Sequence, residues 1–177
     1  MERWIERETV FDGRIFRVEK GEAVLDDGTT AQREVVSHPG GVAVVALREG
    51  KVLLVRQFRI AINDYLLELP AGKREGMEAP DNRAARELEE ETGYRASRLR
   101  LMLSYFSSAG FTDERMYIYL ASGLFEVGQH LEKDERIEVI AVALEQAQEM
   151  ITAGQIIDAK TIIGLRELLA RPELQAG

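Results

Sequence analysis

The amino-acid sequence predicts an α/β fold, in which helices cover both faces of a mixed central sheet and a small antiparallel β unit precedes that sheet. Residues 42–47 and 52–55 are almost continuously apolar, which is typical of strands that are buried on both faces. Helical patterns follow at residues 80–92, 145–152 and 160–169, with strand-like segments between them. Strands and helices that alternate in this way are characteristic of α/β proteins.

The first 38 residues predict a separate β unit. Turn signals at Asp12-Gly13 and at residues 26–28 separate short stretches in which apolar and polar side chains alternate. A unit of this size cannot bury its apolar face by itself. We therefore expect it to pack either on the core domain of its own chain, residues 39–177, or on a second subunit.

The remaining elements follow from turn and cap signals. Glu49-Gly50 predicts a turn between the first two central strands. Pro80 suits the first turn of a helix, and Gly93 suits the left-handed position that ends it. Further strands are predicted near residues 66–70, 99–106, 116–120 and 137–144.

Length, charge and composition exclude several classes of protein. The chain has 177 residues and a formal net charge of −8, which argues against a nucleic-acid polymer as its partner. It has no cysteine and hence no disulfide or thiolate zinc site. Since no apolar run approaches the roughly eighteen residues of a membrane span, we expect neither a membrane segment nor a signal peptide. A cytoplasmic protein is the expectation.

One predicted helix carries three carboxylates on one face. At about 100° per residue, Glu87, Glu90 and Glu91 fall within an arc of about 100°. Like charges four residues apart destabilise a helix by a few tenths of a kcal/mol, which an Arg86–Glu90 pair offsets only in part. Bound Mg²⁺ or Mn²⁺ would make the three carboxylates stabilising instead of destabilising. The alternative is that they form an ordinary charged helix face exposed to solvent. The adjoining arc should pack against the sheet and contains Ala84, Ala85, Leu88 and Thr92.

The segment from Gly72 to Tyr94 resembles the Nudix box, G-x5-E-x7-R-E-U-x-E-E-x-G-U, where U is a bulky aliphatic residue. Tyr94 takes the place of the second aliphatic residue, which should alter packing rather than chemistry. Nudix proteins are Mg²⁺-dependent hydrolases of nucleoside diphosphates linked to another group, so the resemblance implies pyrophosphate hydrolysis on an α/β/α sandwich. The matching positions are Gly72, Glu78, Arg86, Glu87, Glu90, Glu91 and Gly93.

The resemblance implies roles for the residues of this helix. Glu87 and Glu91 should bind metal together with the backbone carbonyl of Ala71, and two or three Mg²⁺ or Mn²⁺ ions are expected. Glu90 should coordinate a metal or help to deprotonate the attacking water. Arg86, four residues before Glu90, should orient that carboxylate.

An acidic loop at residues 128–135 is the expected source of a further carboxylate, because many sugar-nucleotide Nudix enzymes take one from a mobile loop outside the box. Glu135 is the first choice as general base or additional metal ligand. Glu132 and Asp134 compete for this role, and an ordinary solvated loop is the alternative.

The substrate class is indicated by residues 105–114. Ser108, Gly110 and Glu114 resemble the S-P-G-x-x-x-E element of ADP-ribose pyrophosphatases, although Ala109 stands in place of its proline. This resemblance implies a small nucleoside diphosphate substrate, either ADP-ribose or a related sugar. GDP-mannose, a damaged nucleoside triphosphate and a non-catalytic ADP-ribose sensor remain as alternatives.

Four more residues are expected to contact substrate. Arg56 and Arg59 are candidates to hold diphosphate oxygens or a terminal ribose phosphate. Arg33 and Glu34 resemble positions that contact the nucleotide in this branch of the family, across a homodimer; ordinary surface charge is the alternative for these two. Gly110 and Glu114 complete the predicted substrate site.

Overall fold

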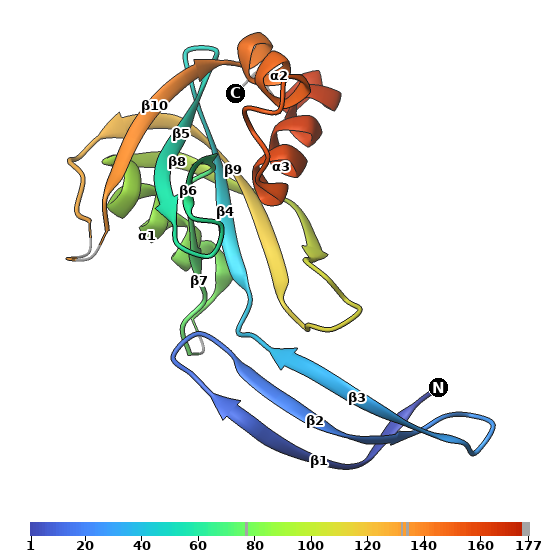
Figure 1. Cartoon of the computed structure of the whole chain (residues 1–177). Helices are drawn as coiled ribbons and strands as arrows, with labels where there is room; N and C mark the ends of the chain where they lie inside the picture. The colour runs from blue at the N-terminus through green and yellow to red at the C-terminus, as the bar shows by residue number, and fades with distance from the viewer. Residues whose placement is uncertain (77, 132, 134, 175–177) are drawn as a thin grey trace.

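The chain folds into two sheets, a small antiparallel one and a larger mixed one that helices cover (Figure 1). A computed structural model describes residues 1–76, 78–131, 133 and 135–174. In the view of Figure 1 the small sheet extends below the α/β body, and the chain passes from one to the other after Ser37. The predicted fold class is confirmed.

The small sheet is formed by β1 (Arg3–Asp12), β2 (Arg17–Val24) and β3 (Thr30–Ser37), in that order. Most of β1 is exposed, including Ile5 at 54% and Val10 at 50% of their full accessible surface. As the sequence predicts, the three strands leave large apolar side chains of β1 exposed.

The larger sheet has the order β10-β5-β4-β9-β8, with β6 paired to β5 and β7 paired to β4. Only the β4–β9 pair is parallel among the pairs that the structure describes. The expected strand at residues 66–70 proves to be two strands on either side of Pro70. The strands are β4 (Gly41–Arg48), β5 (Lys51–Arg59), β6 (Asp64–Glu68), β7 (Ala71–Lys73), β8 (Tyr94–Phe106), β9 (Arg115–Glu126) and β10 (Ile137–Ala143).

β4 is buried on both of its faces, as its apolar run predicts, because helices lie on both faces of this sheet. Val42 and Val44 pack in a cluster with residues of α1 (Pro80–Thr92). Ala43 and Val45 belong to the opposite cluster, with residues of α2 (Leu144–Thr152) and α3 (Ala159–Ala170). A short 3-10 turn, Pro172–Leu174, follows α3. None of the helices in the described part of the chain is long and apolar enough to cross a membrane.

The ends of α1 agree with the sequence signals. Pro80 occupies the first turn, and Gly93 has φ 78° in the left-handed region. A Cβ at position 93 would also lie 2.9 Å from the backbone nitrogen of Gln129. Glycine is therefore required here both by the backbone angle and by the close approach of the loop after β9.

Candidate active site

Two glutamates of α1 face the interior of the protein rather than solvent. Glu87 is 4% exposed and Glu91 is 3% exposed, whereas Ala85, which was expected to pack, is exposed. Compared with the expected packing arc, the buried face of α1 is thus rotated away from Ala85 and toward Glu87 and Glu91. The backbone nitrogen of Ala71 on β7 donates to Glu91 Oε2 at 2.8 Å. A Cβ at Gly72 would overlap the carboxylate of Glu87, so the box glycine makes room for that group.

Burial dominates the electrostatics of this pair. It raises the pKa of Glu87 to about 7, against the opposing effect of Arg83, and Glu90 and Glu135 raise it further. Burial raises the pKa of Glu91 to about 8, although the hydrogen bond from Ala71 lowers it. Two acidic groups whose ionisation is this unfavourable form a site that a cation would stabilise strongly.

Arg83 is a member of this site that the sequence analysis missed. Its side chain is buried and its guanidinium contacts the carboxylate of Glu87, four residues later on the same stripe of α1. That spacing was a signal in the sequence, because residues four apart in a helix are neighbours. Arg83 supplies the positive charge that faces Glu87 in this structure.

The expected contact between Arg86 and Glu90 is wrong for this structure. Arg86 Nη2 instead lies 2.6 Å from Glu78 Oε2, in the loop before α1. The physical reason is the direction of helical side chains, which lean toward the N-terminus of their helix. Arg86 therefore joins the start of α1 to the preceding loop.

The donor set fits a hard divalent cation. Glu87 and Glu91 supply buried carboxylate oxygens of raised pKa, beside a glycine that leaves space for them. Carboxylates of this kind suit Mg²⁺ or Mn²⁺, which complete their coordination with water and phosphate oxygens. Among the described residues, no three acidic or histidine side chains already converge as a complete set of ligands. Substrate and water would supply the remaining ligands.

The loop after β9 brings a further carboxylate toward the two buried glutamates. Glu135 interacts electrostatically with both Glu87 and Glu91 and raises both pKa values. The loop is attached to the end of α1, where Gln129 Nε2 donates to the carbonyl of Glu91 at 2.6 Å. Glu132 and Asp134, the competing candidates, lie outside the described residues.

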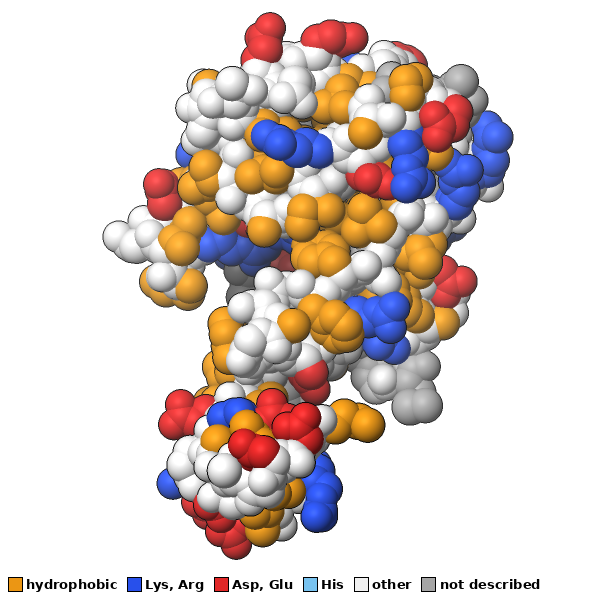
Figure 2. All heavy atoms as spheres, turned by 90° about the vertical axis from the view of Figure 1, so that its right-hand side faces the viewer, with side chains coloured by type: hydrophobic (Ala, Val, Ile, Leu, Met, Phe, Trp, Pro, Cys, Tyr) orange, Lys and Arg blue, Asp and Glu red, His pale blue; other side chains and the backbone are white. Residues whose placement is uncertain are grey.

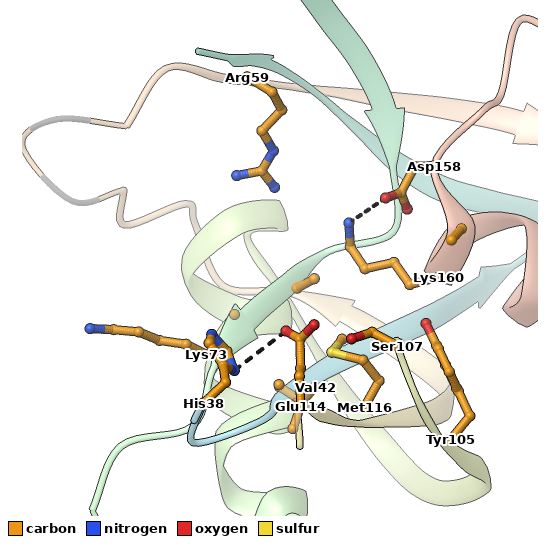
Figure 3. A pocket seen from close by; sticks show the side chains of 14 residues that line it. His38, Val42, Arg59, Lys73, Tyr105, Ser107, Glu114, Met116, Asp158 and Lys160 are labelled. Atoms are coloured by element: carbon orange, nitrogen blue, oxygen red, sulfur yellow. Dashed lines mark ion pairs between the residues drawn. The ribbon is translucent and has the colours of Figure 1, made fainter. Parts of the chain in front are cut away.

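A pocket of about 340 Å³ opens beside β7 (Figure 3). Ala71 and Gly72 form part of its wall, so it adjoins the buried glutamates. Arg59 and Glu114, two of the predicted substrate contacts, line it. Three cationic side chains, Arg59, Lys73 and Lys160, face a compartment large enough for part of a nucleotide sugar. Its other polar lining residues are His38, Tyr105, Ser107, Glu114 and Asp158.

The wall that carries Glu114 is tied to β3. The backbone nitrogen of Val36 donates to the carbonyl of Phe111 at 2.7 Å, and Asp113 accepts from the backbone nitrogen of His38 at 2.7 Å. His38 Nδ1 lies 3.4 Å from Glu114 Oε1 and accepts from Gly40 N at 3.0 Å. In the neutral ring the hydrogen is therefore on Nε2.

Four of the predicted substrate contacts do not line this pocket: Arg33, Glu34, Arg56 and Gly110. Arg33 Nε donates to Glu2 at 2.9 Å within the small sheet, and Glu34 is exposed on the same strand. Arg56 lies 3.6 Å from Glu138 on β10, with its guanidinium over the ring of Tyr65. Within one chain, these four positions lie outside the pocket beside β7.

Comparisons with known proteins agree with this arrangement. The family model described as "NUDIX domain" matches residues 37–163. An ADP-ribose pyrophosphatase from Bacillus subtilis (strain 168) is 39% identical over 99% of this chain and 96% of its own. A methanol dehydrogenase activator from Bacillus methanolicus is 38% identical over 98% of this chain and 96% of its own. A solved structure titled "Crystal structure of ADP compounds hydrolase" superposes with a TM-score of 0.85 at 20% identity, covering 99% of this chain and 95% of that one.

Proposed function

The chain belongs to the NUDIX family and is a pyrophosphohydrolase, and we propose that it cleaves ADP-ribose or a related nucleoside diphosphate sugar. The products would be a nucleoside monophosphate and a sugar phosphate. One observation carries the proposal: two buried carboxylates of raised pKa adjoin a pocket lined by three cations. That combination suits a divalent metal next to the diphosphate of a small anionic substrate. The Bacillus subtilis relative supports ADP-ribose as the first substrate to test.

The ligands in this proposal are the carboxylates of Glu87, Glu90 and Glu91 and the carbonyl of Ala71. We propose two or three Mg²⁺ or Mn²⁺ ions. When bound, such ions neutralise phosphate charge and lower the pKa of coordinated water. The guanidinium of Arg83 contacts the carboxylate of Glu87 in this structure. If Glu87 binds a metal ion, part of this contact would have to be replaced by the bond to the ion.

The chain's own side chains account for the rest of the reaction. Hydrolysis joins the oxygen of water to one phosphorus, breaks the bridging P–O bond and releases a proton. Glu135 would accept that proton, and the effect of its charge on both buried glutamates supports this role. Arg59 and Lys160 donate to diphosphate oxygens from the pocket wall. Glu114 accepts a hydrogen bond from a sugar hydroxyl.

The small sheet completes the proposal at the level of the assembly. We propose a homodimer in which residues 1–38 act as a separate domain beside the catalytic domain, residues 39–177. Arg33 and Glu34 would then contact the nucleotide bound by the other subunit, which would explain why they lie outside the pocket of their own chain. A charged nucleotide sugar as substrate supports a cytoplasmic location.

Replacing Glu90 or Glu91 by Gln tests the function directly. Each variant should lose several orders of magnitude in turnover of ADP-ribose with Mg²⁺, while its circular dichroism and melting temperature stay close to those of the parent. Glu89→Gln is the matched control, because Glu89 is on the same helix but pairs with Arg95 on the surface, at 2.6 Å and 2.9 Å. Near-parental rates in both test variants would sink the assignment.

Product analysis identifies the substrate. ADP-ribose, GDP-mannose and 8-oxo-dGTP are offered in turn, and the released monophosphate is separated by anion-exchange chromatography. We expect AMP from ADP-ribose to be released with the highest kcat/KM. Binding of ADP-ribose without any AMP in saturating Mg²⁺ would favour a non-catalytic sensor.

A further inference from the structure

We propose that Glu68 is a positioning residue that aims two cations, Arg59 and Lys160, at the diphosphate of the substrate. The inference rests on the proposed function and adds a residue to it. Glu68 does not line the pocket and has no place in the Nudix box. Its role would be exerted through the two cations that do line the pocket.

Glu68 lies at the end of β6 and is only 1% exposed. Its two carboxylate oxygens accept from Arg59 Nε at 2.6 Å and from Arg59 Nη2 at 2.8 Å. This forked contact fixes the plane of the guanidinium. These two bonds use the hydrogen of Nε and one hydrogen of Nη2, so both hydrogens of Nη1 and the second hydrogen of Nη2 are left to donate toward a ligand.

The same carboxylate also restrains Lys160 at the start of α3. Lys160 Nζ contacts Glu68 Oε2 and lies 3.0 Å from Asp158 Oδ1. Asp158 in turn caps α3 by accepting from the backbone nitrogen of Thr161 at 3.0 Å. With two acidic partners, the ammonium has one of its three hydrogens left for a phosphate oxygen.

Three elements thus meet at one buried carboxylate: β5 through Arg59, β6 through Glu68 and α3 through Lys160. Burial by itself would raise the pKa of Glu68, but the hydrogen bond from Arg59 and the charge of Lys160 outweigh it and the pKa is lowered. Glu68 is therefore ionised. In Figure 3 both cationic side chains enter the same end of the pocket, across from His38 and Lys73.

The four charged residues Arg59, Lys160, Glu68 and Asp158 together carry no net charge, so their contribution is to hold two cationic donors in fixed positions. Arg59 and Lys160 carry two positive charges, and Glu68 and Asp158 carry two negative ones. An anion gains little from a neutral cluster at long range, but it gains from donors already held in place, because no side chain has to be ordered on binding. Glu68 is the one member that contacts both pocket cations.

Glu68→Gln in the full-length protein tests the proposal. The measurement is calorimetric binding of the non-hydrolysable α,β-methylene analogue of ADP-ribose with Mg²⁺, followed by steady-state kinetics with ADP-ribose. We expect affinity for the analogue to fall by about 10- to 100-fold, the range for loss of a charge-assisted contact. Glu167→Gln is the matched control, because it breaks the ion pair between Glu167 on α3 and Arg171, which follows the helix, and neither residue lines the pocket. The affinity of this variant for the analogue should match that of the parent.

A double-mutant cycle separates positioning from a structural role. If Glu68 acts through Arg59 and Lys160, adding Glu68→Gln to the Arg59→Lys/Lys160→Gln variant should weaken binding less than threefold further. Full additivity, or a Glu68→Gln variant that binds the analogue within twofold of the parent, would overturn the proposal. Should Glu68→Gln not fold, Arg59→Lys and Lys160→Gln replace it, and parental affinity in both would overturn the proposal equally. Binding that follows these expectations without AMP release would refute the proposed hydrolysis alone.

Discussion

At the scale of single residues, Gly72 sets the space available to the first buried carboxylate. Gly72→Ala should lower kcat/KM for ADP-ribose about 100-fold, because a methyl group there overlaps Glu87 and a displacement near 1 Å can cost about that much. Gly50→Ala is the control, since its φ of 72° strains alanine while its Cβ would meet no atom within 4 Å. Kinetics and melting temperatures of both variants check the prediction. Equal activity in the two would contradict it.

The two raised pKa values predict how the stability of the metal-free protein depends on pH. Folded Glu87 and Glu91 hold protons up to about pH 7 and 8, whereas the unfolded chain releases them near 4.5. Between these pH values the native state binds more protons than the unfolded chain, so the free energy of unfolding should fall by several kcal/mol as pH rises from about 5 to 8. Urea unfolding with a chelator measures this slope. The Glu87→Gln/Glu91→Gln double variant should flatten it; an unchanged slope would refute the explanation.

The sequence could predict some site residues and not others for a physical reason. Glu87 and Glu91 follow from the helical period, which is local, and the structure buries them on one stripe. Glu68 and Lys160 are 92 residues apart, and only the packing of α3 on the sheet joins them. The partner of Arg86 was misjudged because spacing alone does not state which way a helical side chain leans.

At the scale of elements, the end of β3 pairs with residues 105–114, the segment that the sequence associates with the substrate. The last residues of β3 pair with residues 111–113, with a parallel bridge between Val36 and Thr112. The two central strands, the turn between them and the limits of α1 were predictable, because burial on both faces, turn glycines and caps are local signals. The three-residue strand β7 was not, because it is defined by its pairing with β4 and not by its composition.

The attachment of this loop to β3 predicts an effect on substrate binding. Asp113→Ala removes the acceptor for the backbone nitrogen of His38 and leaves the backbone contacts of Val36 to hold the segment that ends at Glu114. We expect KM for ADP-ribose to rise about 10-fold, as for a lost hydrogen bond to a charged group, with kcat changed less. Asp64→Ala, at the start of β6, is the control, since its side chain accepts only a local backbone hydrogen bond in the described structure. A KM equal to that of the control would show that β3 does not position the loop.

At the scale of the whole molecule, the small sheet is the feature that a single chain leaves unexplained. Hydrophobic side chains interrupt its charged surface at the bottom of Figure 2, and exposed Ile5, Val10 and Phe11 all lie on β1. Burying these side chains on a second subunit would gain roughly 25 cal/mol for each Å² of apolar surface removed from water. The same contact would bring Arg33 and Glu34 to another chain.

The homodimer is therefore predicted to depend on β1 and to support catalysis. Light scattering at micromolar concentration should give twice the mass of the 19.9 kDa chain. Ile5→Lys/Val10→Lys should halve that mass and raise KM for ADP-ribose, because Arg33 and Glu34 would lose the site of the other subunit. Phe125→Lys, an equally exposed apolar position on β9, should stay dimeric and active. A parent protein that is monomeric, or a monomeric variant with parental KM, would confine the substrate site to one chain and leave Arg33 and Glu34 as surface charges.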